Sequence, residues 1–243
     1  MLRIVSSKPK LRKLLEFSSI DGELDTIWWK YDANGIIQKQ VDPSFTVAVI
    51  SKINKSFFTE YQADGEGEIK ISSALTDILR KYFKEVETIE LNVEGNNLIL
   101  KSRDEVYEGS TLQVELPVAE INVKEEEYGF IPELKGGVKG VYGIDSEDWA
   151  IKASEIKIHY GNTLRLSVTL EEEGGKYTRG VKILDKKNIT GEGVVTIDGK
   201  MFNKVIELFS GPLYLIVTEG PIVLTQKTSE YTISYVVAPK VEE

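Results

Sequence analysis

The 243-residue sequence predicts an α+β fold built from two similar halves. Short apolar runs between turn signals predict strands, and four amphipathic segments predict helices. The order of these elements is the same on both sides of a polar segment, although no residue-by-residue repeat accompanies it. We therefore expect domains at 1–117 and 135–243, joined by a connector at 118–134. Each domain would carry a sheet covered by two helices on one face.

The predicted strands mostly alternate apolar with polar residues, as expected for sheets with one buried face. The clearest example is 111–116, which reads TLQVEL. Turn sequences at 32–35, 42–43 and 94–97 separate the apolar runs. The strands expected are 2–5, 24–31, 35–41, 45–53, 66–71, 88–93, 97–101 and 110–116 in the first half, and 138–142, 156–160, 163–170, 177–184, 193–197, 213–218, 222–226 and 231–237 in the second.

Helices are expected over 8–18, 73–84, 146–154 and 199–209, because apolar residues recur there at intervals of three and four. A residue that can cap the first free backbone N–H groups precedes each one: Ser7, Ser73, Asp145 or Ser146, and Asp198. The apolar faces expected to be buried comprise Leu11, Leu14, Leu15 and Ser18; Leu75, Ile78, Leu79, Tyr82 and Phe83; Trp149 and Ala153; and Met201, Phe202, Val205, Leu208 and Phe209.

Composition excludes several classes of site. The chain has no cysteine, which excludes disulfides, zinc–thiolate sites, iron–sulfur clusters and cysteine nucleophiles. His159 is the single histidine, so a site with several histidine ligands cannot form. Residues 1–13 lack the apolar core of a secretory signal, and no run of 18 apolar residues occurs. We therefore expect a soluble, intracellular protein without a membrane partner.

No sequence pattern indicates an enzyme or a bound cofactor. Phosphate-binding and dinucleotide-binding glycine motifs are absent, and Gly137, Gly140 and Gly143 have the wrong spacing. The acidic run 171–173 would alternate between the faces of a strand, so its carboxylates would not converge on one metal ion. His159 lies beside a predicted turn, where a surface or structural role is the plainer interpretation. We predict no catalytic residues, no metal site and no cofactor.

Basic residues dominate the outer faces of three predicted helices, although 39 acidic against 30 basic residues give the chain a net charge of −9. A solvated face is the plainer explanation, since lysine is common in exposed helices. The third predicted helix presents Asp148, Lys152 and Glu155 instead. The basic residues are Lys8, Lys10, Arg12 and Lys13 on the first helix, Arg80, Lys81 and Lys84 on the second, and Lys200 and Lys204 on the fourth.

Several segments resemble the sliding clamps of the proliferating cell nuclear antigen (PCNA) family, archaeal type. Residues 235–243, YVVAPKVEE, are similar to the family's C-terminus, and 129–133, GFIPE, to the end of its interdomain connector. The segment 57–61, FFTEY, and the helix and strand predicted over 73–91 resemble the family in the same order. The match in order and length covers the whole chain, which would make it a divergent member.

The resemblance implies a ring of subunits, each with two clamp domains, with helices lining the hole and sheets outside. Such a ring is a DNA polymerase processivity factor for DNA replication and repair. It encircles duplex DNA without reading its sequence, and the basic helix residues would face the phosphates. The expected assembly is a homotrimer, with a heterotrimer as the alternative. The expected location is the cytoplasm, in association with the nucleoid.

Family clamps also bind DNA polymerase, the clamp loader, flap endonuclease and ligase through a short peptide motif, the PIP box, in an apolar pocket under the connector. The matching pocket residues here are Val41, Phe45, Thr46, Ala48, Phe130, Ile131, Pro132, Pro221, Val236, Ala238 and Pro239. Val41 and Ala48 suit core packing equally well. Val236 stands where the family has an aromatic residue, which implies a shallower pocket.

The resemblance further implies that the last strand of the first domain pairs with a strand of a neighbour's second domain. Both segments read as edge strands that need a partner. The matching residues are Thr111, Leu112, Val114 and Leu116, and Tyr177, Arg179, Val181 and Ile183. Alternatives to a ring-forming clamp are a divergent subunit of a mixed ring, a free regulator, an unrelated β-rich binding module, and a hydrolase whose carboxylates the sequence does not reveal.

Overall fold

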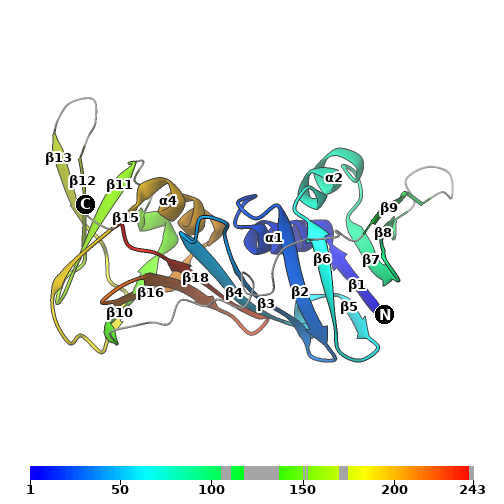
Figure 1. Ribbon diagram of the computed structural model, residues 1–243, viewed down its shortest axis with the longest axis horizontal. Coiled ribbons are helices and arrows are strands. Elements are labelled where there is room, and N and C mark those ends of the chain that lie inside the picture. Colours follow the sequence, from blue (N-terminus) through cyan, green and yellow to red (C-terminus); the bar gives the residue numbers. More distant parts are fainter. Residues whose placement is uncertain (105–110, 118–136, 150, 152, 170–174, 241–243) are drawn as a thin grey trace. The chain divides into compact units, whose positions relative to one another are not determined.

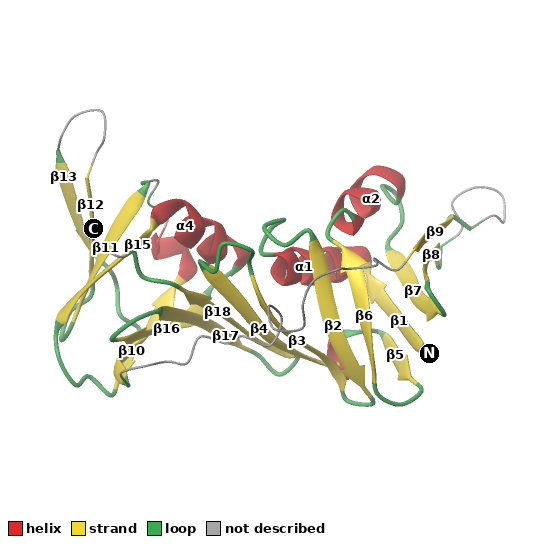
Figure 2. Cartoon of the chain, in the orientation of Figure 1, coloured by secondary structure: helices red, strands yellow, loops and turns green. Residues whose placement is uncertain are grey.

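The computed structural model describes residues 1–104, 111–117, 137–149, 151, 153–169 and 175–240. The chain forms two compact units whose segments interleave along the sequence (Figures 1 and 2). Unit 1 comprises Met1–Lys39, Ser51–Glu126 and Thr228–Thr232. Unit 2 comprises Gln40–Ile50, Glu127–Lys227 and Ile233–Glu243.

Most of the predicted strands are confirmed, two of them with the same bounds. Unit 1 holds β1 (Leu2–Ser7), α1 (Lys8–Ser19), β2 (Thr26–Asp32), η1 (Lys55–Phe57), β5 (Glu60–Ala63), β6 (Gly67–Ser72), α2 (Leu75–Tyr82), β7 (Thr88–Glu94), β8 (Asn97–Ser102) and β9 (Gln113–Pro117). Unit 2 holds β10 (Val138–Asp145), η2 (Ser146–Trp149), β11 (Glu155–Tyr160), β12 (Arg165–Thr169), β13 (Lys176–Gly180), β14 (Asp185–Lys187), β15 (Gly193–Asp198), α4 (Gly199–Leu208), β16 (Pro212–Thr218) and β17 (Ile222–Lys227). Three strands have residues in both units: β3 (Gly35–Val41), β4 (Val47–Asn54) and β18 (Tyr231–Val237).

The strands form three sheets. A five-stranded sheet of unit 1 has the order β5-β1-β7-β8-β9, and a four-stranded sheet of unit 2 has the order β13-β12-β11-β15. Their neighbouring strands are antiparallel. The third sheet has the order β14-β10-β16-β17-β18-β4-β3-β2-β6. The α+β prediction is therefore confirmed.

In unit 1, α1 packs against β1, β2 and β7 and lies beside α2 (Figure 1). The predicted inward residues Leu11, Leu14 and Leu15 are all buried. Ser18 is buried too, where its hydroxyl accepts a hydrogen bond from the indole Nε1 of Trp29 at 3.0 Å. This bond satisfies a polar group that burial would otherwise penalise.

Three details of these helices differ from the prediction. Ser7 is the N-cap residue of α1, but its side chain makes no capping hydrogen bond. The N-cap of α2 is Ala74 rather than Ser73, because the helix begins only at Leu75. Tyr82, predicted to face inward, is 56% exposed, whereas Leu79 and Phe83 are buried as predicted.

In unit 2, α4 packs against β11 and β15. Phe202, Val205 and Phe209 are buried as predicted. The ring of Trp149, in η2, lies 5.4 Å from that of Phe202. Asp198 caps the helix as predicted, with its Oδ1 accepting from the Met201 N–H at 2.8 Å.

The prediction of a helix over 146–154 is wrong for the part of this segment that the structure describes. The structure has a single 3-10 turn there, Ser146–Trp149. The Ser154 carbonyl accepts from the Gly199 N–H at 2.9 Å, and the Ile151 carbonyl accepts from Asn203 Nδ2. A Cβ on Gly199 would lie 2.1 Å from the Ala153 carbonyl oxygen, so this segment packs directly on the start of α4. In an α-helix, these carbonyl oxygens would accept hydrogen bonds from backbone N–H groups four residues later. Here the carbonyl oxygens of Ile151 and Ser154 accept from residues of α4 instead.

The strand predicted over 177–184 is correct only in its first part, because β13 ends at Gly180. After it, the Val181 N–H donates to Leu164 at 2.9 Å, and the Leu184 N–H donates to Gly143 at 2.7 Å. After β13, the chain therefore no longer pairs with β12. It pairs with β10 instead and forms the short strand β14, which was not predicted. The prediction also missed β5, a four-residue strand that pairs with β1.

Candidate interaction surfaces

Two of the predicted DNA-facing lysines at the start of α1 are bound within unit 1. Lys8 Nζ donates to the Phe83 carbonyl at 2.9 Å and to the Lys84 carbonyl, at the C-terminal end of α2. A cation is favourable there because the last carbonyls of a helix carry partial negative charge. Lys10 Nζ forms an ion pair of 2.7 Å with Glu230 and lies 5.1 Å from the centre of the Phe57 ring.

The other basic residues of α1 and α2 are mostly held by local contacts. Arg12 pairs with Glu16 at 3.2 Å, and Arg80 with Asp77 at 3.4 Å. Lys13 Nζ lies 5.2 Å from the Phe17 ring centre, and Lys81 Nζ lies 5.3 Å from that of Tyr82. Lys84 and, on α4, Lys200 are exposed, whereas Lys204 is half-buried. Exposed ion pairs are weak, so these cations can exchange an internal partner for an external anion.

Asp42 organises the turn between β3 and β4. Its Oδ1 accepts from the backbone N–H groups of Thr46 at 2.7 Å and Val47 at 2.6 Å. Its Oδ2 accepts from the Ser44 N–H at 3.1 Å and the Thr46 hydroxyl at 3.1 Å. This turn holds Phe45 at φ 57°, a costly backbone conformation for an aromatic residue, with the side chain 52% exposed. The turn thus presents an aromatic side chain to solvent.

Three predicted pocket residues meet beside this turn, all within unit 2. Val41, Ala48 and Val236 form an apolar cluster with Val223, and the half-buried Ile50 and Ile216 pack against it. We call these six residues the apolar cluster. Val223 and Asp42 were not predicted as members of this site, although the apolar start of β17 and the run Asp-Pro-Ser-Phe-Thr were visible in the sequence.

The remaining predicted pocket residues lie around the apolar cluster or outside the described residues. The Ala238 N–H donates to the Thr46 carbonyl at 2.8 Å, which joins the chain after β18 to the Asp42 turn. Pro239 forms an isolated bridge with Ile197, and Pro221 lies in the turn before β17. The predictions that fall outside the described residues are Phe130, Ile131 and Pro132.

Both strands predicted to contact another subunit lie at sheet edges. In the described part of the chain, β9 pairs only with β8 and β13 only with β12. Leu112, Val114 and Leu116 are half-buried and Thr111 is exposed. Thr111 and Leu112 lie before β9, which begins at Gln113 rather than at the predicted residue 110. On the other strand, Tyr177 is exposed and Arg179 is half-buried, whereas Val181 and Ile183 fall after its end. The charged side chain of β9 is Glu115, whereas β13 carries Lys176 and Arg179, so the two edges have opposite charge.

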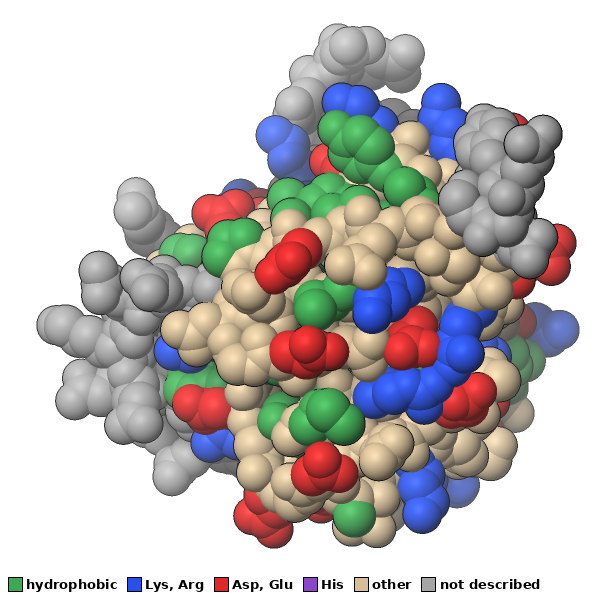
Figure 3. Space-filling view, turned by 90° about the vertical axis from the view of Figure 1, so that its right-hand side faces the viewer, with side chains coloured by type: hydrophobic (Ala, Val, Ile, Leu, Met, Phe, Trp, Pro, Cys, Tyr) green, Lys and Arg blue, Asp and Glu red, His purple; other side chains and the backbone are tan. Residues whose placement is uncertain are grey.

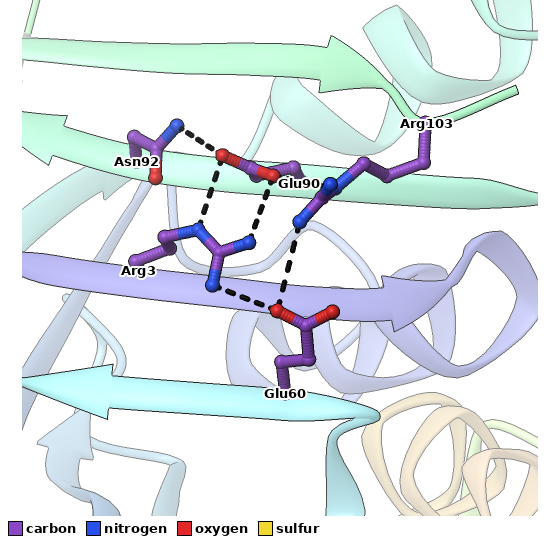
Figure 4. A network of polar contacts seen from close by, with 5 residues as sticks. All are labelled: Arg3, Glu60, Glu90, Asn92 and Arg103. Atoms are coloured by element: carbon purple, nitrogen blue, oxygen red, sulfur yellow. Dashed lines mark hydrogen bonds and ion pairs between the residues drawn. The ribbon is translucent and has the colours of Figure 1, made fainter.

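The five-stranded sheet carries a network of paired charges (Figure 4). Arg3 donates to both oxygens of Glu90 at 3.2 Å and to Glu60 at 2.8 Å. Arg103 contacts Glu90 at 2.6 Å and Glu60 at 3.6 Å, and Asn92 donates to Glu90 at 2.9 Å. Figure 3 shows basic and acidic side chains interspersed on this side of unit 1. Two arginines and two glutamates balance here, so the network has no excess charge to offer a ligand.

The network shifts the pKa values of its members. Burial acts to raise the pKa of Glu90, but hydrogen bonds from Asn92 and Arg3 and the charges of both arginines hold it below the usual value. The carboxylates of Glu90 and Glu60, which accept hydrogen bonds from Arg3, raise the pKa of that guanidinium. Both shifts favour the charged forms and therefore the ion pairs.

No group of three or more acidic or histidine side chains among the described residues is placed to hold a metal ion. Within the same residues, no helix has the length and apolar character needed to cross a bilayer. His159 is half-buried and its Nε2 lies 2.6 Å from the Ser167 hydroxyl.

Solved structures with the same fold were found over the full length of the chain. PCNA from Entamoeba histolytica is 15% identical with a TM-score of 0.80, over 99% of each chain. A PCNA2–PCNA3 complex from Sulfolobus tokodaii is 16% identical with a TM-score of 0.79, over 99% of this chain and 100% of that one. A. fulgidus PCNA bound to the C-terminal region of FEN-1 is 16% identical with a TM-score of 0.79, over 100% of both chains.

The chain has the PCNA fold. The resemblance seen in the sequence is therefore confirmed at the level of structure. No protein-family model and no curated protein matches the sequence itself. Within the PCNA fold, α1, α2 and α4 carry the basic residues, and the Asp42 turn and apolar cluster occupy unit 2.

Proposed function

We propose that this protein is a DNA sliding clamp, a non-enzymatic processivity factor that encircles duplex DNA and tethers replication and repair enzymes. The observation that carries the proposal is the full-length likeness to PCNA structures, with TM-scores of 0.77–0.80. A place in the cytoplasm, associated with the nucleoid, belongs to the same proposal.

The two open sheet edges support ring closure. An edge strand exposes unpaired backbone groups, and a second strand of opposite charge can satisfy them. We propose that β9 of one subunit pairs with β13 of the next to close a trimer. A homotrimer needs only this chain, because it carries both edges. In a heterotrimer, one of the edges would meet a different subunit.

The molar mass in solution tests ring closure. Light scattering at several protein concentrations is expected to give about three times 27.3 kDa. Glu115→Lys should dissociate the trimer, because it places like charges opposite Lys176 and Arg179. Combining it with Lys176→Glu should restore part of the association, and Glu94→Lys, at an exposed site on β7, should leave the trimer intact. A monomer at every concentration contradicts self-closure and favours a mixed ring or a free regulator.

The basic helix residues support contact with duplex DNA. Phosphate contacts by lysine and arginine give attraction without sequence preference, which permits sliding. We expect Lys84 and Lys200 to contribute most, because both are exposed. Lys8 should contribute least, because its ammonium group already binds carbonyls of α2.

Retention on DNA tests this part of the proposal. With a cognate loader, the clamp should remain on closed circular DNA and slide off a linear duplex. Lys84→Gln together with Lys200→Gln should shorten retention, and Lys39→Gln together with Lys227→Gln is the charge-matched control. Equal retention on circular and linear DNA would contradict topological linkage.

The Asp42 turn and the apolar cluster support a site for partner peptides. Phe45 is exposed, and Ile50 and Ile216, the half-buried members of the apolar cluster, add apolar surface. The chain around Ala238 offers main-chain groups. Such a combination suits a peptide with one aliphatic and two aromatic anchors. We propose that DNA polymerase, the clamp loader, flap endonuclease and ligase bind here.

A synthetic peptide with these three anchors tests the site by fluorescence anisotropy. Phe45→Ala should weaken its binding by about tenfold, as expected for loss of one anchor contact. Ile37→Ala, which removes an exposed apolar side chain of unit 1, should leave binding unchanged. Equal losses in the two variants would argue against a specific pocket.

A further inference from the structure

The four-stranded sheet of unit 2 has a polar outer face with a basic centre. Ile156, Ile158, Leu166 and Val168 are buried, so the alternate residues of β11 and β12 lie on the opposite face. Glu155 lies on that face of β11 as well. We call six further residues on that face of β11, β12 and β13 the basic sheet face: Lys157, His159, Arg165, Ser167, Lys176 and Thr178.

Strand register brings these residues together across the sheet. Lys157 lies opposite Ser167, and Ser167 lies opposite Thr178. His159 lies opposite Arg165 in the next row. All six residues line one open hollow of about 930 Å³. The face therefore places cations and hydroxyl groups from three strands around a common space.

Arg165 on this face differs from the other arginines of the chain in its contacts. Arg3, Arg12, Arg80 and Arg103 form ion pairs with carboxylates, and Arg179 donates to the Asp148 carbonyl. Arg165 is exposed, and its guanidinium group has no hydrogen bond or ion pair to the described part of the chain. The same holds for the ammonium group of Lys176.

Two acidic residues of the described part of the chain also line the hollow. Glu155 contributes to the hollow but pairs with Lys240 at 3.1 Å, and Glu192 lies beyond the other end of β11, next to Gly161. The His159 ring is positioned by its contact of 2.6 Å with the Ser167 hydroxyl. That hydroxyl stands in the same row as Lys157, where it can donate to or accept from a bound group.

We propose that the basic sheet face binds a phosphoryl group carried by a serine or threonine side chain of a partner protein. A phosphoryl group has three acceptor oxygens and a charge between −1.5 and −2, so it suits donors that converge from several strands. Arg165 and Lys157 would supply the charge, and Ser167 and Thr178 would supply hydroxyl donors. Four of the six residues lie on the inner strands β11 and β12, apart from the peptide site and the basic helices, so their role does not depend on the clamp proposal. Lys176 and Thr178 lie on β13, the edge strand that the clamp proposal pairs with a neighbour.

A duplex nucleic acid suits this face less well. Lys157, Arg165 and Lys176 are the lysines and arginines that line the hollow, and two glutamates line it too. Strong binding to a phosphate backbone depends on neutralising many phosphates at once. A local excess of positive charge instead suits a single dianionic group on an extended segment.

Fluorescence anisotropy with a labelled Gly-, Ala- and Ser-containing peptide tests the proposal. One form of the peptide carries a single phosphothreonine, and its twin carries threonine. The phosphorylated form should bind at least about tenfold more tightly than its twin. Arg165→Gln should weaken the binding of the phosphorylated form by about tenfold. Lys227→Gln, an exposed charge-matched change elsewhere in unit 2, should leave binding unchanged. Amide chemical shifts should move in β11, β12 and β13.

Three results would overturn the proposal. The first is equal binding of the two peptide forms, and the second is unchanged binding in the Arg165→Gln variant while it remains folded by circular dichroism. The third is displacement of the phosphopeptide by duplex DNA at equal phosphate concentration, which would assign the face to nucleic acid. Inorganic phosphate should compete only at higher concentration, because it lacks the peptide's main-chain contacts.

Discussion

The five-stranded sheet of unit 1 and the four-stranded sheet of unit 2 use charge in opposite ways. On the first, Arg3 and Arg103 face Glu60 and Glu90 in a balanced network (Figure 4). On the second, Arg165 has no such partner among the described residues. A balanced network ties neighbouring strands together, whereas an unbalanced face has charge available for a ligand. The comparison separates arginines that stabilise the fold from an arginine that serves recognition.

Removing the central arginine of the balanced network should have the largest effect. Arg3→Gln should cost about 2 kcal/mol of unfolding free energy, because charge-assisted hydrogen bonds to two glutamates are lost. Urea unfolding in a Trp149→Phe background measures this, since Trp28 and Trp29 then report on unit 1 alone. A loss below about 0.5 kcal/mol, the usual scatter of surface substitutions, would show that the network is not stabilising.

The helix caps of the two units should differ by a smaller amount. Asp198→Ala should cost about 1 kcal/mol, because the Asp198 carboxylate accepts from the Met201 N–H at 2.8 Å. Ser7→Ala should cost less than about 0.5 kcal/mol, because the Ser7 side chain makes no capping bond. Urea unfolding of both variants tests the contrast, and equal costs would contradict it.

Acid should weaken the balanced network specifically. The pKa of Glu90 is lower in the folded protein than its ordinary value of 4.5, so its stabilising contribution is present above that pH. The contribution is lost as the pH falls through the folded-state pKa. Glu90→Gln should therefore flatten the loss of stability on acidification below about pH 4.5, measured as thermal midpoints at several pH values. Glu94→Gln, at an exposed position of β7, should keep the wild-type dependence.

The smallest effect is expected on the unbalanced face. Arg165→Gln should change the unfolding free energy by less than about 0.5 kcal/mol, because Arg165 is exposed and the described residues offer it no partner. Urea unfolding followed through Trp149 in a Trp28→Phe, Trp29→Phe background reports on unit 2. A cost close to that of Arg3→Gln would assign Arg165 a structural role and remove the contrast between the sheets.

Local patterns predicted much of the fold. Strands β3 and β18 have the predicted bounds, because alternation and flanking turn residues act within a few positions. The buried face of α1 was predicted from spacing alone. The short strands β5 and β14 were missed, since each has only three or four residues and depends on its neighbouring strand.

The candidate sites were only partly predictable. Edge positions for β9 and β13 followed from the resemblance, and the sheet orders confirm them. Glu60, Glu90 and Arg103 gave no local signal, because their meeting with Arg3 depends on strand pairing across 57 to 100 positions of sequence. The basic sheet face was missed for the same reason.

The sequence by itself determined the α+β class, the alternating strands and the apolar helix faces, because these depend on periodicity and capping within one element. It also excluded cysteine chemistry and sites with several histidines. Only the tertiary structure decided that the helix predicted from Ser146 ends after a single 3-10 turn at Trp149. The reason is that groups of α4 donate hydrogen bonds to the carbonyl oxygens that follow this turn. It likewise decided which arginines are neutralised, since ion pairs form between side chains that the sheets bring together from distant positions.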